Sequence, residues 1–245
     1  MTIRCWASAH SSCGGGQSQE HLISKGFFET AMTTVQGFDW CPNEPVKVSV
    51  ARLTANILCR KHNSLLGPVD DGGIDAYRAF QRAEDSGSTE PFPPSVDGPL
   101  FERWLLKTAI NLSYRHSLKL GVGMWNSVAG IPSAYLLEVV FGDVPFADSM
   151  GAYFLFPQEQ FRYQKGQGLI TPIHKNGEIG GVYFHLSGFD IFLSLFPGAV
   201  PPTLGEMGIT TLPSHILSAV IVYRSPTIIT VDIDQRQHET KFNWR

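Results

Sequence analysis

The first 85 residues contain all four cysteines of this chain but few of the regularly spaced apolar residues that build a core. A small segment of this kind rarely offsets the entropy of chain ordering without metals or disulfides. Four cysteines among 245 residues, and no charged-then-apolar leader at Met1–Arg4, argue against a secreted disulfide framework. We therefore expect a cytoplasmic protein in which thiols bind a metal or fill the core.

Composition excludes several classes of protein. A content of 43% hydrophobic and 17% charged residues is typical of a globular chain, and a net charge of −3 gives no overall basic excess for nucleic-acid binding. The stretch Ile179–Val200 is long enough to cross a bilayer, but it contains His185 and Asp190 near its middle and is interrupted by glycines. We expect no membrane partner, and any phosphate contact must be local.

The chain divides into a metal-binding part at residues 1–85, a linker at 86–99 and an α+β domain of unknown role at 100–245. The linker is rich in Pro, Gly and Ser, which disfavours a helix or a central strand. In the last part, an amphipathic helix is predicted with Leu100 and Trp104 on its buried face and Glu102, Arg103 and Lys107 on the other.

The pattern of apolar residues predicts the individual elements. Helices are expected at Cys59–Leu66, Gly72–Glu84 and Leu100–Leu118. Strands are expected at Val48–Leu58, Ala152–Phe156, Leu169–Ile173, Gly181–Leu186, Ile216–Tyr223 and Thr227–Ile233, with turns at Asn176-Gly177 and Ser225-Pro226. The fold class is α+β: a small zinc-stapled module followed by a helix and an antiparallel-sheet domain.

Cysteine and histidine spacing predicts one zinc site. Cys59 and His62, separated by two residues at the start of a short helix, are suited to half of a tetrahedral site. Cys5 and Cys13 are expected to provide the other half. His10 or Cys41 could substitute for one of this second pair.

Two segments together carry a resemblance to a known family. Gln19-Glu20-His21-Leu22-Ile23-Ser24 is followed about 40 residues later by Leu58-Cys59-Arg60-Lys61-His62-Asn63, and Cys5 and Cys13 lie upstream. In this order they resemble HNH endonucleases of the ββα-metal, treble-clef type, over roughly residues 4–71. The chain departs from the family pattern in its wide Cys5–Cys13 spacing, in Ser24 where the family has Pro, and in His62 where the family has Cys.

The resemblance implies a function and a site. His21 would be the general base that activates water, and Glu20 and Asn63 would hold a Mg²⁺ or other divalent cation at the scissile phosphate of DNA. Arg60 and Lys61 lie beside this site in the sequence and could contact backbone phosphates.

The sequence allows alternative interpretations of several residues and of the function. Asp70 and Asp71 are expected to cap the helix that begins near Gly72, or to orient His62 or Asn63. The histidines of the presumed sheet are interpreted as structural; they are His174, His185, His215 and His238. The alternative to an endonuclease is a non-catalytic zinc-stapled module that binds nucleic acid or protein, with residues 100–245 as a possible surface for a protein partner.

Overall fold

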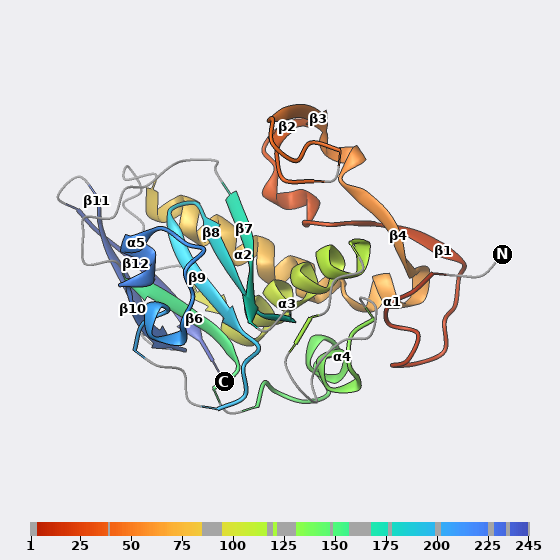
Figure 1. Ribbon diagram of the computed structural model, residues 1–245. Helices are drawn as coiled ribbons and strands as arrows, with labels where there is room; N and C mark the ends of the chain where they lie inside the picture. Colours follow the sequence, from red (N-terminus) through yellow and green to blue (C-terminus); the bar gives the residue numbers. More distant parts are fainter. Residues whose placement is uncertain are drawn as a thin grey trace.

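Two long helices, α2 (Gly67–Glu84) and α3 (Gly98–Arg115), cross the middle of the molecule in the computed structural model (Figure 1). The N-terminal strands lie on one side of them and a five-stranded sheet lies on the other. The structure describes residues 4–38, 40–84, 95–116, 120–121, 131–147, 149–156, 168–175, 178–198, 202–224, 228–233 and 236–244.

The N-terminal part is built around two antiparallel strand pairs, β1 with β4 and β2 with β3. A short helix, α1, follows β4 directly and leads into α2. The elements are β1 (Gln17–His21), the 3₁₀ turn η1 (Lys25–Phe27), β2 (Met32–Val35), β3 (Val46–Ser49), the 3₁₀ turn η2 (Val50–Arg52), β4 (Thr54–Cys59) and α1 (Arg60–Leu65).

The C-terminal part contains an antiparallel sheet in the order β10-β6-β9-β8-β7 and a smaller sheet in the order β11-β12-β5. In the smaller sheet, β12 pairs with β5 in parallel. The elements are β5 (Ser95–Asp97), α4 (Ala134–Phe141), β6 (Gly151–Phe156), β7 (Gly168–Lys175), β8 (Glu178–Leu186), β9 (Phe189–Ser194), the 3₁₀ turn η4 (Gly205–Met207), α5 (Ser214–Leu217), β10 (Val220–Tyr223), β11 (Ile228–Ile233) and β12 (Arg236–Asn243).

Both faces of the five-stranded sheet are covered. Alternate residues of a strand point to opposite faces, so Phe154 packs on the helical side while its neighbour Tyr153 packs under the segment that carries η4 and α5. Strands β6 and β9 are therefore buried along almost their whole length. The core on the helical side continues from Cys5 in the N-terminal part to Phe242 in β12.

Helices α2 and α3 approach closely because α2 has glycine at the contact. A Cβ on Gly73 would lie 2.1 Å from Cγ of Trp104, so no larger residue fits there without displacing the indole. Trp104 stacks in turn on Phe27, with ring centroids 4.4 Å apart. The contact fixes the indole between the two helices and η1.

The predicted mixed α+β class and the helix at Cys59–Leu66 are confirmed, the latter as α1. Helix α2, however, begins at Gly67, because Pro68 is compatible with the first turn of a helix. The prediction that Asp70 and Asp71 cap a helix starting at Gly72 is therefore wrong, since both lie inside α2.

The predicted solvent face of α3 is also wrong. Glu102 is 3% exposed and Lys107 is 1% exposed, so the helix is buried on nearly all sides. Helical periodicity places charged residues toward water, but these two have partners elsewhere in the chain. Oε2 of Glu102 accepts from Nη2 of Arg224 at 3.0 Å, and its Oε1 accepts from the backbone N–H of Ala152 at 2.8 Å.

The predicted strands at Ala152–Phe156, Leu169–Ile173 and Gly181–Leu186 are confirmed within β6, β7 and β8. The strand expected at Val48–Leu58 is two strands, β3 and β4, separated by η2. In the segment expected as a strand at Ile216–Tyr223, the first residues belong to α5. The two predicted turns lie outside the described residues.

The proposed linker is structured at its C-terminal end. Residues 95–97 form β5, and α3 begins at Gly98 with Asp97 accepting from the N–H of Leu100 as its N-cap. Pairing with β12 supplies the hydrogen bonds that local sequence could not predict. The division at residues 85 and 100 stays a prediction, although the buried core spans it.

Among the helices in the described parts of the chain, none combines the length and apolar character that crossing a bilayer requires.

We predict that Gly73→Ala lowers the free energy of unfolding by about 1–3 kcal/mol, because the new methyl group overlaps the Trp104 indole. Gly67→Ala is the matched control on the same helix, since a Cβ there meets nothing within 4 Å. Urea denaturation followed by circular dichroism measures both variants. Equal stability of Gly73→Ala and the wild type would contradict the packing described.

Candidate metal centre

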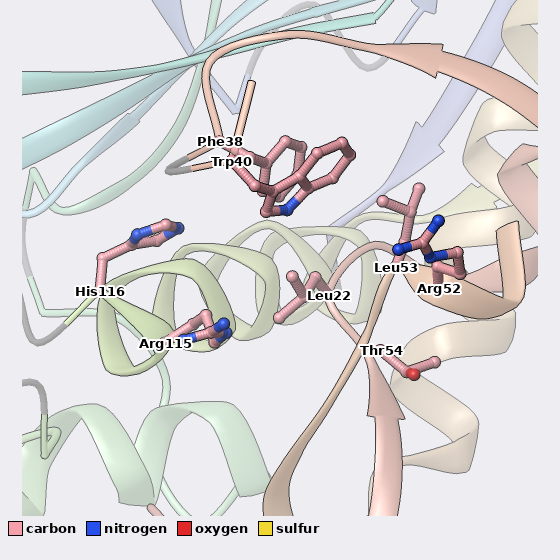
Figure 2. Close-up of a pocket in the computed structure, with 8 residues that line it drawn as sticks. All are labelled: Leu22, Phe38, Trp40, Arg52, Leu53, Thr54, Arg115 and His116. Carbon is pink, nitrogen blue, oxygen red and sulfur yellow. The ribbon is translucent and has the colours of Figure 1, made fainter. Parts of the chain in front are cut away.

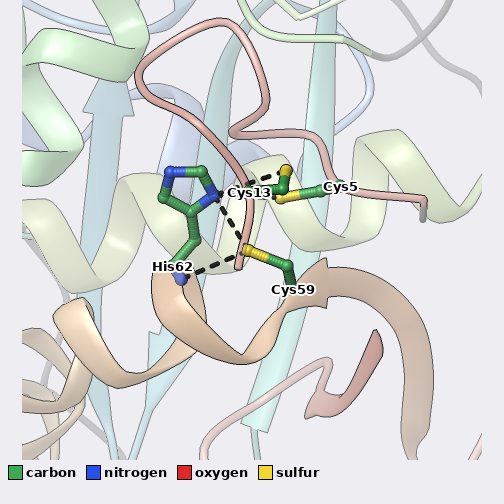
Figure 3. A group of neighbouring side chains, drawn as sticks. All are labelled: Cys5, Cys13, Cys59 and His62. Atoms are coloured by element: carbon green, nitrogen blue, oxygen red, sulfur yellow. Dashed lines mark hydrogen bonds between the residues drawn. The ribbon is translucent and has the colours of Figure 1, made fainter. Parts of the chain in front are cut away.

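Four side chains from two separate parts of the sequence meet at the junction of β4 and α1. Cys5, Cys13, Cys59 and His62 place their ligand atoms within 4.8 Å of one another (Figure 3). Cys59 is the N-cap of α1 and His62 lies one turn inside it. The other two cysteines come from the segment that precedes β1. The predicted set of four ligands is therefore brought together.

Backbone hydrogen bonds hold the N-terminal segment at this junction. The first N–H groups of a helix have no partner within the helix. In α1, the N–H groups of Arg60 and Lys61 donate to the carbonyls of Gly16 and Gly14, at 3.0 and 3.2 Å. The loop after Cys13 thus provides hydrogen-bond acceptors for the first N–H groups of α1.

The distances within the cluster fit a tetrahedral ion. The Nδ1 atom of His62 lies 3.2 Å from Sγ of Cys5, 3.2 Å from Sγ of Cys59 and 4.0 Å from Sγ of Cys13. Tetrahedral metal–sulfur and metal–nitrogen bonds of about 2.3 and 2.05 Å would separate the two atoms by roughly 3.6 Å. The four residues could hold a metal ion such as zinc.

A second partner orients the imidazole. Nε2 of His62 lies 2.8 Å from Oγ of Ser11, which leaves Nδ1 directed at the sulfurs. Nζ of Lys61 donates to the same hydroxyl at 3.3 Å and to the carbonyl of Ser12 at 3.0 Å. Metal-binding histidines commonly bind such a group through the second nitrogen. Lys61, predicted to contact phosphate, thus holds the loop between Cys5 and Cys13 by hydrogen bonds.

Electrostatics distinguish the thiols. Burial raises the pKa of Cys5 to about 12. For Cys59, burial acts in the same direction, but hydrogen bonds from the backbone at His62 and Gly14 and from the side chains of Cys13 and Cys5 together lower its pKa. Burial, with the nearby Lys61, lowers the pKa of His62, which favours the neutral form that binds metals. Since thiols must lose protons to bind a metal, metal affinity will fall as the pH falls.

The two alternative ligands lie outside the cluster. His10 stacks on Phe141 with ring centroids 4.2 Å apart, and its Nε2 lies 2.6 Å from Oδ2 of Asp143. Cys41 is buried and its backbone forms a bridge with Phe38. The structure thus brings Cys5 and Cys13, and not His10 or Cys41, together with Cys59 and His62.

Glu20 forms a buried ion pair with Lys107. It is 4% exposed, and its Oε1 lies 2.5 Å from Nζ of Lys107 and 3.4 Å from Nδ2 of Asn111. Burial raises the pKa of Glu20, and the ammonium of Lys107 opposes that shift. This carboxylate, predicted as a magnesium ligand, thus has a cationic partner within the protein.

Asp70 completes the same network. Its two carboxylate oxygens lie 2.6 and 2.7 Å from Nζ of Lys107, and Oδ1 also accepts from the hydroxyl of Ser24. Ser24 accepts from Nε1 of Trp104 at 2.9 Å. The contacts of Asp70 are therefore with Ser24 and Lys107, not with His62 or Asn63 as the sequence suggested.

His21 and Asn63 lie at different ends of β1. His21 is its last residue, is half-buried and pairs with Thr54 of β4. Burial and then the charges of Lys25 and Lys107 lower its pKa, which favours the neutral imidazole. Asn63 instead donates from Nδ2 to the hydroxyl of Ser18 at 2.8 Å. Because Glu20 and Asn63 contact different partners, a shared magnesium ion stays a prediction.

Lys107 is the central site residue that the sequence analysis missed. It lies in the apolar run from Trp104 to Ile110, where a lone lysine either reaches water or requires buried carboxylates. That run was the available signal. Arg60, predicted beside Lys61 as a phosphate contact, is exposed, and its role stays a prediction.

We predict that Cys59→Ala removes about one equivalent of bound metal and lowers the melting temperature, because a structural site loses a ligand. Cys41→Ala is the matched control: it deletes another buried thiol but leaves the cluster whole. Elemental analysis and thermal denaturation of the two variants and the wild type measure the effect. Equal metal content in all three proteins would rule out the cluster as the site.

We predict that Lys107→Met lowers the free energy of unfolding by about 3–5 kcal/mol, because it leaves two carboxylates without their cation. The triple variant that also carries Glu20→Gln and Asp70→Asn should recover most of the loss. Lys25→Met, at an exposed lysine, is the control. A single variant as stable as the wild type in urea denaturation would contradict the buried ion pairs.

Comparison with known proteins gives no family for this chain. A scan against protein-family models, a search of curated proteins and a search of solved structures each found no match.

Proposed function

We propose that the protein is a zinc-stabilised endonuclease of the HNH type that hydrolyses phosphodiester bonds in DNA. One observation carries this proposal. Strands β1 and β4 and helix α1 form a strand–strand–helix unit with the Cys/His cluster at the β4–α1 junction, while His21 ends β1. The resemblance to HNH endonucleases implies this order along the chain: the base at the end of the first strand, then the second strand, then the helix that holds the structural metal.

The donor set supports zinc as the structural ion. Three thiolates and one imidazole are soft and borderline ligands, which favour zinc over magnesium or calcium. Four protein ligands fill a tetrahedral shell and leave no position for substrate. We therefore assign the cluster to folding, and catalysis to His21 and Glu20 on β1 with Asn63 on α1.

His21 is proposed as the general base. Its imidazole, with an ordinary pKa near 6.5, is largely neutral at physiological pH and can take a proton from water. The hydroxide formed attacks phosphorus, the P–O3′ bond breaks, and the O3′ oxygen leaves and is protonated. A divalent cation would neutralise charge at the phosphate. Glu20 and Asn63 remain its proposed ligands.

The rival function is a non-catalytic module that binds nucleic acid or protein, with residues 100–245 as a protein-binding surface. The ion pair between Glu20 and Lys107 favours it, because this carboxylate would have to leave an ammonium 2.5 Å away to bind a cation. An intact zinc centre is expected under both functions. Activity alone separates them.

We predict that the purified protein nicks supercoiled plasmid only when Mg²⁺ is added, and that His21→Ala lowers the rate at least about 100-fold, the usual contribution of a general base. His215→Ala, at an exposed histidine on α5, is the control prepared in the same way. Metal content and melting temperature should match in all three. Nicking that survives in His21→Ala would contradict the assignment of the base.

Glu20→Gln tests the cation ligand separately. A loss of nicking that higher Mg²⁺ partly restores supports Glu20 as a ligand, whereas unchanged nicking assigns Glu20 to the Lys107 network alone. A wild-type protein that contains zinc but does not nick with Mg²⁺ or Mn²⁺ would favour the binding module.

A further inference from the structure

An open pocket lies where the chain after β1 turns back over the end of α3 (Figure 2). It encloses about 350 Å³, including space open to solvent. Its lining joins four separate parts of the fold: the residue after β1, the loop after β2, η2 with the start of β4, and the end of α3. These residues are Leu22, Phe38, Trp40, Arg52, Leu53, Thr54, Arg115 and His116.

One wall of this pocket is aromatic. The rings of Phe38 and Trp40 are stacked, with centroids 5.6 Å apart and planes 21° from parallel. Trp40 is 50% exposed, although an indole of this size is usually largely buried. The buried Leu22 lies beneath the rings (Figure 2). A flat exposed indole above an apolar floor is a surface on which a planar ring can stack.

The sides of this pocket are cationic. Arg52 and Arg115 are both exposed, and they approach from η2 and from the last turn of α3. Within the described part of the chain, neither guanidinium has an ion-pair partner, and no carboxylate lines the pocket. Guanidinium groups suit phosphate because their N–H groups form a planar fork. The pocket thus combines a stacking surface with phosphate-binding groups.

The pocket adjoins His21. Leu22 follows His21 in the chain, and its N–H donates to the carbonyl of Leu53. Thr54 is the residue that pairs with His21 across β1 and β4. Paired residues of antiparallel strands have Cβ atoms about 5 Å apart. A ligand in the pocket is therefore held beside the end of β1.

We propose that this pocket binds an unpaired nucleotide of a DNA strand, with the base against Trp40 and Phe38 and its phosphates against Arg52 and Arg115. Stacking explains the exposed indole, and the two arginines supply the local positive charge that the chain as a whole lacks. The binding site stands on the pocket alone. That it brings the next phosphodiester to His21 rests on the proposed function.

Anisotropy of a fluorescein-labelled 12-nucleotide single strand in magnesium-free buffer tests the binding. The wild type should bind this strand more tightly than the same sequence in a duplex. Trp40→Ala should weaken binding about 10-fold, and Trp40→Phe, which keeps a ring, less than about 3-fold. Because each phosphate contact on a single strand contributes about 0.7 to the slope of log affinity against log salt, Arg52→Ala and Arg115→Ala should each reduce it by about that amount.

Leu65→Ala and Arg78→Ala are the controls, since these residues are exposed on other elements and should leave affinity and salt dependence unchanged. Matching metal content and melting temperature show that each variant is folded. Three results would overturn the proposal. The first is no binding of the strand by the wild type, and the second is wild-type affinity in both Trp40→Ala and Arg115→Ala. The third is displacement of the strand by the acidic peptide hexaglutamate, equally well from the wild type and from Trp40→Ala, which would show binding by charge alone.

The same assay in His21→Ala separates the two proposals. Strand binding that is intact in His21→Ala and lost in Trp40→Ala supports the pocket, even if plasmid nicking proves independent of His21. Nicking that needs His21 but not Trp40 or the two arginines would keep the endonuclease and reject the pocket.

Discussion

The two ionised side chains buried on α3 need partners, and those partners come from opposite sides of the molecule. Lys107 is neutralised by Glu20 of β1 and Asp70 of α2, and Glu102 by Arg224 beyond β10. The two lie five positions apart along the helix, which places them about 140° apart around its axis. Burying a charge without a partner destabilises the fold by far more than a buried ion pair stabilises it. Helix α3 therefore fixes the positions of the N-terminal strands and of the sheet relative to each other.

The metal cluster acts on an N-terminal segment that also contacts this helix. Residues 4–16 have no strand or helix of their own among the described elements, and they are held by Cys5, Cys13 and the hydrogen bonds at the start of α1. A bound cation would stabilise the thiolate of Cys5, whose pKa burial raises to about 12. The segment also carries Trp6, which donates from Nε1 to Asn111 of α3 at 3.0 Å. Trp6 thus links the segment that carries two of the cluster's cysteines to α3.

Local patterns were enough to predict α1 and half of the cluster, because Cys59 and His62 are three positions apart and their spacing is itself the signal. Contacts between distant residues were not accessible in this way. The face of α3 was assigned by periodicity, which cannot show that Lys107 meets Glu20, 87 positions away (107 − 20). Strand β5 has three residues and depends on a parallel partner near the C-terminus. Glu20 was interpreted as a ligand because the resemblance to HNH endonucleases implied one. The apolar run around Lys107 indicated a buried carboxylate partner, but not which carboxylate.

The aromatic wall of the pocket belongs to the chain that leaves β1 and returns at β4. That chain makes its own two-stranded hairpin, β2 with β3, while the cluster lies at the far end of β4, next to α1. Changes within the β2–β3 hairpin can therefore accumulate over evolutionary time without disturbing the four residues of the metal cluster. Recognition at the proposed pocket could then change while the metal-binding scaffold stays the same.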